Sequence, residues 1–174
     1  NIALCLAGGH PIFGEYKVVK PQKVYYLALE GSYYEMLDRI RMMRTVVPIN
    51  ADNLCIDTFS MFNALSQKQV DGMIEHIGKW GNPDWVFTDP IYMAVAGGLS
   101  KDESASAFVH FSEKLKKTFG CSHFLCHHPI KPTYDRDGQE IPKRDDFYGS
   151  MWLKAHVDAS WRIEYGTAPD KPIL

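Results

Sequence analysis

The sequence predicts an α/β fold of three layers, in which a mostly parallel central sheet is flanked by helices. Three observations predict this fold class. Short runs rich in β-branched and aromatic residues alternate with longer segments whose apolar residues recur at helical spacing. Several of the short runs are apolar nearly throughout, which is typical of strands buried on both faces. Serine-led helix starts separate several of these runs.

Five segments are predicted as strands from their β-branched and aromatic content. A chain that alternates strands and helices in this order forms parallel strands, because each helix carries the chain back to the starting edge of the sheet. The five segments are residues 23–29, 53–59, 84–89, 122–128 and 159–165.

Three longer helices are predicted from the capping-box pattern, in which a serine caps the helix and an acid or amide three residues later reaches back. Apolar residues at helical spacing follow each start, and the last of these helices is expected to end at Gly120. A first short helix over residues 2–7 is expected to end at Gly8-Gly9. The three starts are Ser32–Glu35, Ser66–Gln69 and Ser100–Glu103.

Length and charge limit the function classes. The 174 residues suit one domain with a real core, and the net charge of −2 provides no global positive field for nucleic acid. The apolar runs are far shorter than the about 18 residues that a membrane-spanning helix needs, and we recognise no secretory leader. The four cysteines lie in apolar runs, which favours reduced thiols in a cytosolic protein over disulfides.

The candidate functional residues are those expected at the carboxyl ends of the strands, because ligands of an open parallel sheet bind beyond that edge. Glu30 follows the first strand, Asp89 ends the third, and His127 and His128 end the fourth. An aspartate there is able to hold Mg²⁺ beside a phosphate, and a glutamate is able to polarise a water. Taken alone, Asp89 also suits a turn cap, and Glu30 suits the start of a helix.

The segment 121–131, CSHFLCHHPIK, raises the alternative of a metal site, because it contains two cysteines and three histidines. Strand alternation places Cys121 and His123 on one face and Cys126 on the other. No second C-x-x-C cluster exists to complete a zinc site. We therefore expect a strand that is buried through Cys126, with the two following histidines emerging at its end.

Residues 129–148 interrupt the alternation with a long polar segment that contains three prolines. A loop of this length inside a compact domain is usually functional or disordered. Five acidic residues offset its basic ones, so a solvated surface loop is the alternative to a DNA contact. The basic candidates for contact with the phosphates of single-stranded DNA are Lys131, Arg136, Lys143 and Arg144.

Four runs, in order, resemble the RecA-like ATPase core: VYYLALEGS, DWVFTDPIYMAVAGG, FLCHHPIK and DDFYGSMWLKAHVDASWRIE. The resemblance is strongest to the RepA-type hexameric replicative helicases and their phage relatives, and it covers essentially the whole chain. It implies a single RecA-like domain over residues 1–174, cut at both ends, in a cytoplasmic protein of bacterial or phage type.

The resemblance also implies a role for each candidate. Glu30 matches the glutamate that activates the attacking water, and Asp89 matches the Walker B aspartate that holds Mg²⁺, with Gly31 also expected at the nucleotide. His127 and His128 match the strand end that senses the γ-phosphate. The implied cofactors are ATP and Mg²⁺. The implied partners are single-stranded DNA and further copies of the chain in a ring or filament.

One departure from this family is large, because no G-x-x-x-x-G-K-[ST] phosphate loop occurs in the sequence. We expect that loop to lie upstream of Asn1, and the chain without it to be inactive as an ATPase. A non-catalytic RecA-like module for assembly or regulation is the first alternative. A metallohydrolase that uses His127, His128 and Asp89 is a less favoured one.

Overall fold

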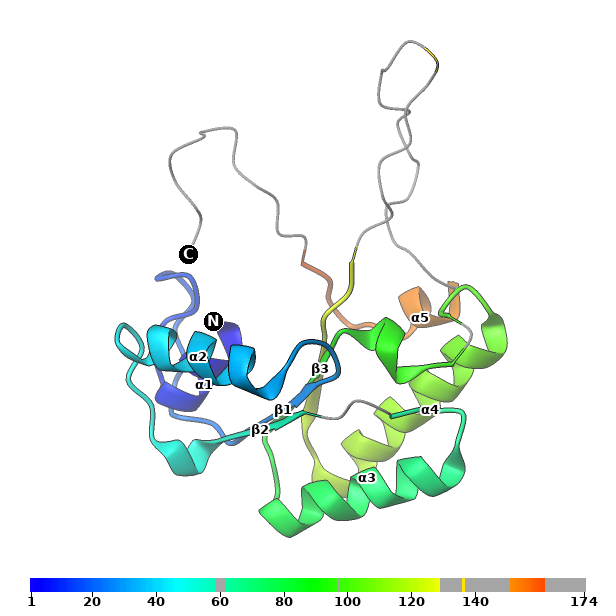
Figure 1. Ribbon diagram of the computed structural model, residues 1–174, viewed down its shortest axis with the longest axis horizontal. Coiled ribbons are helices and arrows are strands. Elements are labelled where there is room, and N and C mark those ends of the chain that lie inside the picture. The colour runs from blue at the N-terminus through cyan, green and yellow to red at the C-terminus, as the bar shows by residue number, and fades with distance from the viewer. Residues whose placement is uncertain (59–61, 97, 129–135, 137–150, 162–174) are drawn as a thin grey trace.

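A parallel β-sheet forms the centre of the fold in the computed structural model. Neighbouring strands are parallel throughout, in the order β2-β1-β3-β4, which confirms the predicted three-layer architecture (Figure 1). The strands are β1 (Val24–Ala28), β2 (Leu54–Thr58), β3 (Trp85–Asp89) and β4 (Ser122–Leu125). The residues that the structure describes are 1–58, 62–96, 98–128, 136 and 151–161.

Helices cover both faces of the sheet. α1 and α2 lie on one face, α3 and α4 lie on the other, and α5 packs on α4 (Figure 1). The crossover from β1 to β2 passes through α2, whereas those leading to β3 and β4 pass through α3 and α4. The helices are α1 (Ile2–Gly8), α2 (Tyr33–Arg44), α3 (Gln67–Trp80), α4 (Asp102–Phe119) and α5 (Met151–Ala155), with 3₁₀ helices at Ala51–Asn53 and Ile91–Ala94.

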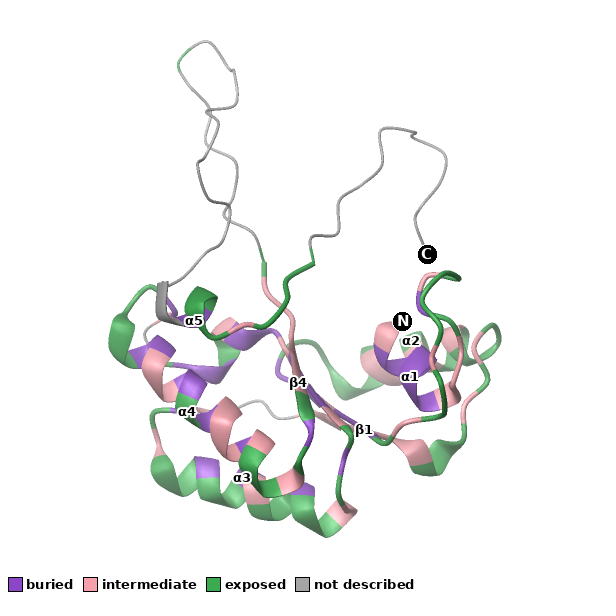
Figure 2. Cartoon of the chain, turned by 180° about the vertical axis from the view of Figure 1, so that it is seen from behind, coloured by how far each residue is buried: buried purple, intermediate pink, exposed green. Residues whose placement is uncertain are grey.

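Two apolar clusters hold the layers together. The larger lies between the sheet and α3, α4 and α5, and includes the fully buried Leu27, Ile77 and Phe108. The smaller lies between the sheet and α1, and includes Ala7 and Phe87. Each strand contributes to both clusters because successive side chains point to opposite faces. The buried residues accordingly concentrate on the strands and on the inward sides of the helices (Figure 2).

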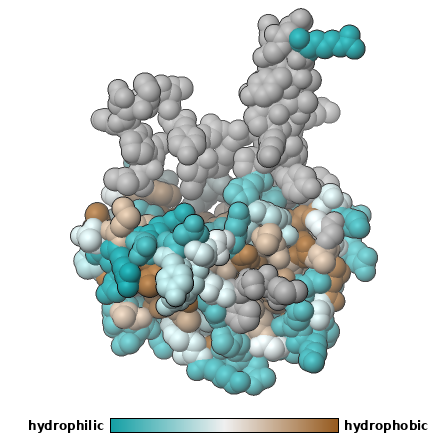
Figure 3. All heavy atoms as spheres, in the orientation of Figure 1, coloured by the Kyte–Doolittle hydropathy of each residue, from teal (hydrophilic) through white to brown (hydrophobic). Residues whose placement is uncertain are grey.

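Hydrophilic side chains cover the outside of these clusters. On α3 the buried residues Val70, Met73 and Ile77 recur at helical spacing, and most residues between them are exposed. Hydrophilic side chains gather along the lower edge of Figure 3, where α3 lies in the same orientation in Figure 1. None of the helices in the described ranges is long and apolar enough to cross a membrane.

Several predicted helix ends are confirmed. α1 stops at Gly9, which has a φ of 72°, and α4 stops at Gly120, which has a φ of 66°. Both glycines occupy the left-handed region that side chains disfavour. The predicted capping box of α2 also forms. The Ser32 hydroxyl accepts a hydrogen bond from the Glu35 amide at 3.2 Å, and the Glu35 carboxylate accepts one from the Ser32 amide at 3.0 Å.

The other two capping-box predictions are wrong. Ser66 precedes α3 without a side-chain cap, and the Gln69 side chain accepts a hydrogen bond from the amide of Asn63 at 2.7 Å instead of bonding to the amide of Ser66. α4 begins one residue later than predicted, with Lys101 rather than Ser100 at the N-cap. This start places Asp102 and Glu103 in the first turn, where negative charge stabilises a helix.

Two strand predictions also need correction. β4 ends at Leu125 rather than at residue 128, because its partner β3 ends at Asp89 and the chain after that strand turns into the 3₁₀ helix Ile91–Ala94. Residues 159–161 of the last predicted strand form no strand, and 162–165 lie outside the described residues. The loop 129–148 lies outside them as well, except for Arg136. All four cysteines are free, as predicted.

Candidate functional site

The strand order creates a crevice at the carboxyl edge of the sheet. From β1 the chain first moves outward to β2, and it then returns to place β3 on the other side of β1. Neighbouring strands whose connections leave in opposite directions form a topological switch point, which is where open α/β sheets bind ligands. Glu30 follows β1 and Asp89 ends β3. Both predicted carboxylates therefore flank this switch point.

Asp89 accepts hydrogen bonds from two side chains on the neighbouring strands. The Tyr26 hydroxyl of β1 donates to Asp89 Oδ2, and the Cys126 thiol that follows β4 also bonds to this carboxylate. We refer to Asp89, Tyr26 and Cys126 as the Asp89 cluster. Sheet register explains the first contact, because Tyr26 lies opposite Phe87 and Asp89 is the next residue of β3 on the same face.

Burial keeps both donors of the Asp89 cluster protonated at neutral pH. It raises the pKa of Tyr26, and the hydrogen bond to Asp89 and the charge of that carboxylate raise it further. Burial, followed by the negative charge of Asp89, raises the pKa of the Cys126 thiol to about 12. The tyrosine hydroxyl and the thiol are therefore donors, and the carboxylate is the acceptor.

Positive charge reaches the Asp89 cluster from α2. The start of α1 also lies beside the cluster, because Asn1 is close to Cys126 and Asp89. Arg39 of α2 partly opposes the rise in the pKa of Tyr26, so its positive charge acts on the same cluster. An arginine near a carboxylate edge offers a fixed positive charge to an anionic ligand.

Glu30 and His128 meet through a residue that the sequence reasoning did not identify. The Tyr92 hydroxyl donates to Glu30 Oε2 at 2.7 Å, and the centroid of its ring lies 5.7 Å from that of the His128 ring. The hydrogen bond to Glu30, burial, and then the charges of Glu30 and Asp89 raise the pKa of Tyr92. Glu30, Asp89 and His128 thus lie along one edge of the sheet.

The remaining predicted site residues fall into two groups. His127 is partly buried beside the exposed His128, and Gly31 has a φ of 85° that permits the turn from Glu30 into the cap of α2. Arg136 is exposed. The residues outside the described part of the chain are Lys131, Lys143 and Arg144.

The donor set suits Mg²⁺. Carboxylate oxygens are its preferred protein ligands, and it usually takes one or two of them together with waters and substrate phosphates. Asp89 and Glu30 provide such oxygens, whereas the protonated Cys126 thiol does not compete for the ion. No three His, Cys, Asp or Glu side chains converge as a metal cage in the part of the chain that the structure describes. The metallohydrolase alternative therefore lacks its ligand group there.

The sequence reasoning missed three functional candidates. Tyr26 and Tyr92 were not singled out, because only the sheet register and the 3₁₀ helix after β3 bring them to the carboxylates. Arg39 is not among the candidates named from the sequence. Arg41 and Arg44 lie in the last turn of α2, where they suit the helix dipole, and Arg39 lies before that turn. That position was the available signal.

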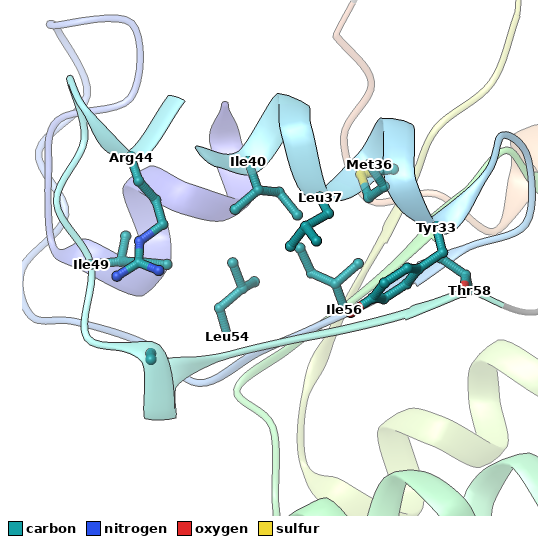
Figure 4. Close-up of a pocket in the computed structure, with 10 residues that line it drawn as sticks. Tyr33, Met36, Leu37, Ile40, Arg44, Ile49, Leu54, Ile56 and Thr58 are labelled. Atoms are coloured by element: carbon teal, nitrogen blue, oxygen red, sulfur yellow. The ribbon is translucent and has the colours of Figure 1, made fainter. Parts of the chain in front are cut away.

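The hollow shown in Figure 4 lies away from the switch point. It occupies about 190 Å³ between α2 and the edge strand β2, and its walls include Leu37, Ile40 and Ile56. Tyr33 and Arg44 stand at its two ends. None of the predicted site residues lines it, so we place the candidate functional site at the switch point instead.

The family model described as an AAA domain matches residues 1–133, which include the whole described sheet together with Glu30, Asp89 and the two histidines. No curated protein matches the chain.

Proposed function

Because the chain belongs to the AAA domain family, we propose that it is the ATP-binding and ATP-hydrolysing domain of a DNA helicase or recombination ATPase. Domains of this class are nucleotide-binding P-loop ATPases, and such families generally use ATP and Mg²⁺. The observation that carries the proposal is the pair of carboxylates, Glu30 and Asp89, at the carboxyl ends of adjacent parallel strands on either side of a switch point.

In this proposal Glu30 orients and polarises the attacking water. Its side chain is exposed at the edge of the sheet, where water reaches it, and the Tyr92 hydroxyl restricts its orientation by donating to one carboxylate oxygen. A positioned carboxylate base of this kind contributes about 10²- to 10⁴-fold to a rate. Glu30 is therefore the residue on which turnover depends most directly.

Asp89 would hold Mg²⁺, with Tyr26 and Cys126 as hydrogen-bond donors behind it. When bound, the ion would neutralise charge on the β- and γ-phosphates. Arg39 would add a second positive charge on the same side of the sheet. These residues bind and orient a triphosphate, whereas Glu30 acts on the water.

His127 and His128 would report the state of the γ-phosphate to the segment that follows them. The contact between the rings of His128 and Tyr92 supports this role, because Tyr92 also holds Glu30. A change in the position of His128 would reach the water-activating carboxylate through a single intervening side chain. Such coupling is the kind of local event that drives switching in ATPases.

Contact with single-stranded DNA and assembly into a ring or filament complete the proposal. They rest on the resemblance to RepA-type helicases and on the basic residues Lys131, Arg136, Lys143 and Arg144. Backbone contacts of this type would be insensitive to base sequence and would weaken with added salt. The alternative of a non-catalytic module has one observation in its favour, which is the absence of a Gly-Lys-Ser/Thr tripeptide from the 174 residues.

The test uses the full-length protein, with any sequence that its gene encodes before Asn1. We expect it to bind ATP and Mg²⁺ and to hydrolyse ATP. We expect Glu30→Gln to lower turnover by about 10²- to 10⁴-fold, the range for a general base, without weakening nucleotide binding. Glu15→Gln, at another exposed loop glutamate, is the matched control and should hydrolyse ATP normally.

Two results would count against the proposal. Absence of nucleotide binding by the full-length protein would favour the non-catalytic module. Normal turnover in Glu30→Gln would remove Glu30 from the reaction.

A further inference from the structure

We propose that Tyr26 is a positioning residue for Asp89: its hydroxyl holds the carboxylate in the one orientation that accepts Mg²⁺. This inference rests on the proposed function, because it concerns the way in which a nucleotide-bound Mg²⁺ would meet Asp89. It adds to that function a residue from β1, a strand that otherwise contributes only Glu30 and Gly31, just beyond its end, to the candidate site.

The sheet register determines that Tyr26 meets the carboxylate of Asp89. Tyr26 pairs with Phe87, so the last residue of β3 is its diagonal neighbour on the same face. The hydroxyl donates to Oδ2. The side chain of Asp89 is thereby tied to the central strand of the sheet rather than left free to rotate at the strand end.

The Tyr26 ring has little freedom to move away. It stacks on the Phe87 ring, with centroids 5.6 Å apart and planes inclined by 17°. Phe87 in turn stacks on Phe124, with centroids 4.6 Å apart and an angle of 22°. The three rings extend across β1, β3 and β4, so the hydroxyl is fixed by packing before any ligand arrives.

Cys126 gives Asp89 a second donor from the opposite neighbouring strand. A thiol is a weaker donor than a hydroxyl, so Tyr26 carries the larger share of the positioning. Partners that orient a metal-binding side chain typically change metal affinity or activity by about 10- to 100-fold when they are removed.

The preceding residue of β1 provides a matched control. Tyr25 donates to Asp57 Oδ2 at 2.5 Å on the other face of the sheet. As with Tyr26, the acceptor lies on the adjacent strand and is the diagonal neighbour of the tyrosine. Removing either hydroxyl deletes one tyrosine–aspartate hydrogen bond from the same strand. Only the loss at Tyr26 should change the response to Mg²⁺, because Asp57 faces α3 rather than the switch point.

The experiment compares full-length wild type with Tyr26→Phe, Tyr25→Phe and Asp89→Asn. Binding of a fluorescent ATP analogue is titrated with Mg²⁺ at equilibrium, and binding of Mn²⁺ is followed by electron paramagnetic resonance. We expect Tyr26→Phe to raise the half-saturating Mg²⁺ concentration at least about tenfold. Binding of the analogue without metal should be unchanged, and Tyr25→Phe should titrate like wild type.

The outcomes separate this inference from the proposed function. If Asp89→Asn loses metal-dependent binding while Tyr26→Phe titrates like wild type, the positioning role is wrong and the ATPase proposal stands. If wild type binds no nucleotide with Mg²⁺, both are wrong.

Circular dichroism and thermal unfolding establish that each variant is folded. If Tyr26→Phe does not fold, the same Mg²⁺ titration is made with variants of Cys126, the other donor to Asp89. Cys126→Ala should raise the Mg²⁺ requirement, and Cys126→Ser, which keeps a donor, should restore it. Equal titration of these two variants would overturn the inference.

Discussion

The two faces of β1 carry the same tyrosine–aspartate pair in two different settings. On one face Tyr26 donates to Asp89, and on the other Tyr25 donates to Asp57. Each aspartate is the diagonal neighbour of its tyrosine on the adjacent strand. Burial, followed by the hydrogen bond to aspartate, raises the pKa of both tyrosines. Local chemistry alone therefore does not distinguish a structural pair from a functional one.

Their surroundings do distinguish them. Asp57 lies on the edge strand β2 and also contacts His76 of α3 at 2.7 Å, so it joins a helix to the sheet. Asp89 lies beside the switch point, where α1 begins and where Tyr92 holds Glu30. We therefore propose a functional role only for the pair that lies beside the switch point.

Within this comparison, the largest expected effect comes from replacing each of the two aspartates by alanine. Asp89→Ala should lower ATP turnover by about 10²-fold or more, since it removes the side chain that we propose for Mg²⁺. Asp57→Ala should leave turnover intact but lower the free energy of unfolding by about 1–3 kcal/mol, because the Tyr25 hydroxyl loses its partner in the core. Steady-state hydrolysis and urea unfolding measure the two effects. Equal losses of activity would remove the distinction between the faces.

A pH effect on stability should come from His123, on the face of the sheet that α4 covers. His123 lies between Thr88 and Ser112, with one ring nitrogen 2.9 Å from the Thr88 hydroxyl and the other 2.8 Å from that of Ser112. Burial lowers the pKa of His123 from its ordinary value of 6.5 to about 3. Between pH 6.5 and pH 3, His123 therefore binds a proton in the unfolded chain but not in the folded one.

The free energy of unfolding should therefore fall as the pH drops from 6.5 towards 3, by about 1.4 kcal/mol for each pH unit. Urea unfolding of the wild type at a series of pH values measures this slope. His123→Gln should lack this part of the pH dependence, and an identical slope in that variant would assign the effect to other groups.

The smallest effect should come from Tyr92, the hydrogen-bond partner of Glu30. Tyr92→Phe removes one hydrogen bond and should lower turnover about fivefold, the equivalent of about 1 kcal/mol. Because Tyr92 is only partly buried and keeps its ring, the midpoint of thermal unfolding should not change. A large drop in that midpoint would mean that Tyr92 serves the fold rather than Glu30.

The fold class, and the placing of the candidate residues at one edge of the sheet, followed from the sequence because both depend on short-range patterns. Alternating runs of apolar residues located all four described strands, and the polar residue after each buried run indicated Glu30, Asp89 and His128. The carboxyl ends of parallel strands always share one edge of a sheet. No knowledge of the strand order was needed to expect these residues together.

Other details depended on competition between distant groups. Ser66 and Gln69 match the capping pattern as well as Ser32 and Glu35 do, yet the loop at Asn63 takes the Gln69 side chain. The prediction of β4 to residue 128 failed for a similar reason, since the end of the neighbouring strand determines where a ladder stops. These outcomes depend on contacts with residues outside the local sequence pattern.

What the sequence determined by itself is the alternation of the four described strands with the helices between them, and the polar residues at the strand ends. Only the tertiary structure decided which tyrosine meets which aspartate, because that choice depends on strand order and register between segments far apart in the chain. In the order β2-β1-β3-β4, β1 has β2 on one side and β3 on the other. Two consecutive tyrosines therefore reach opposite faces and opposite strands, and only one of them reaches the candidate site.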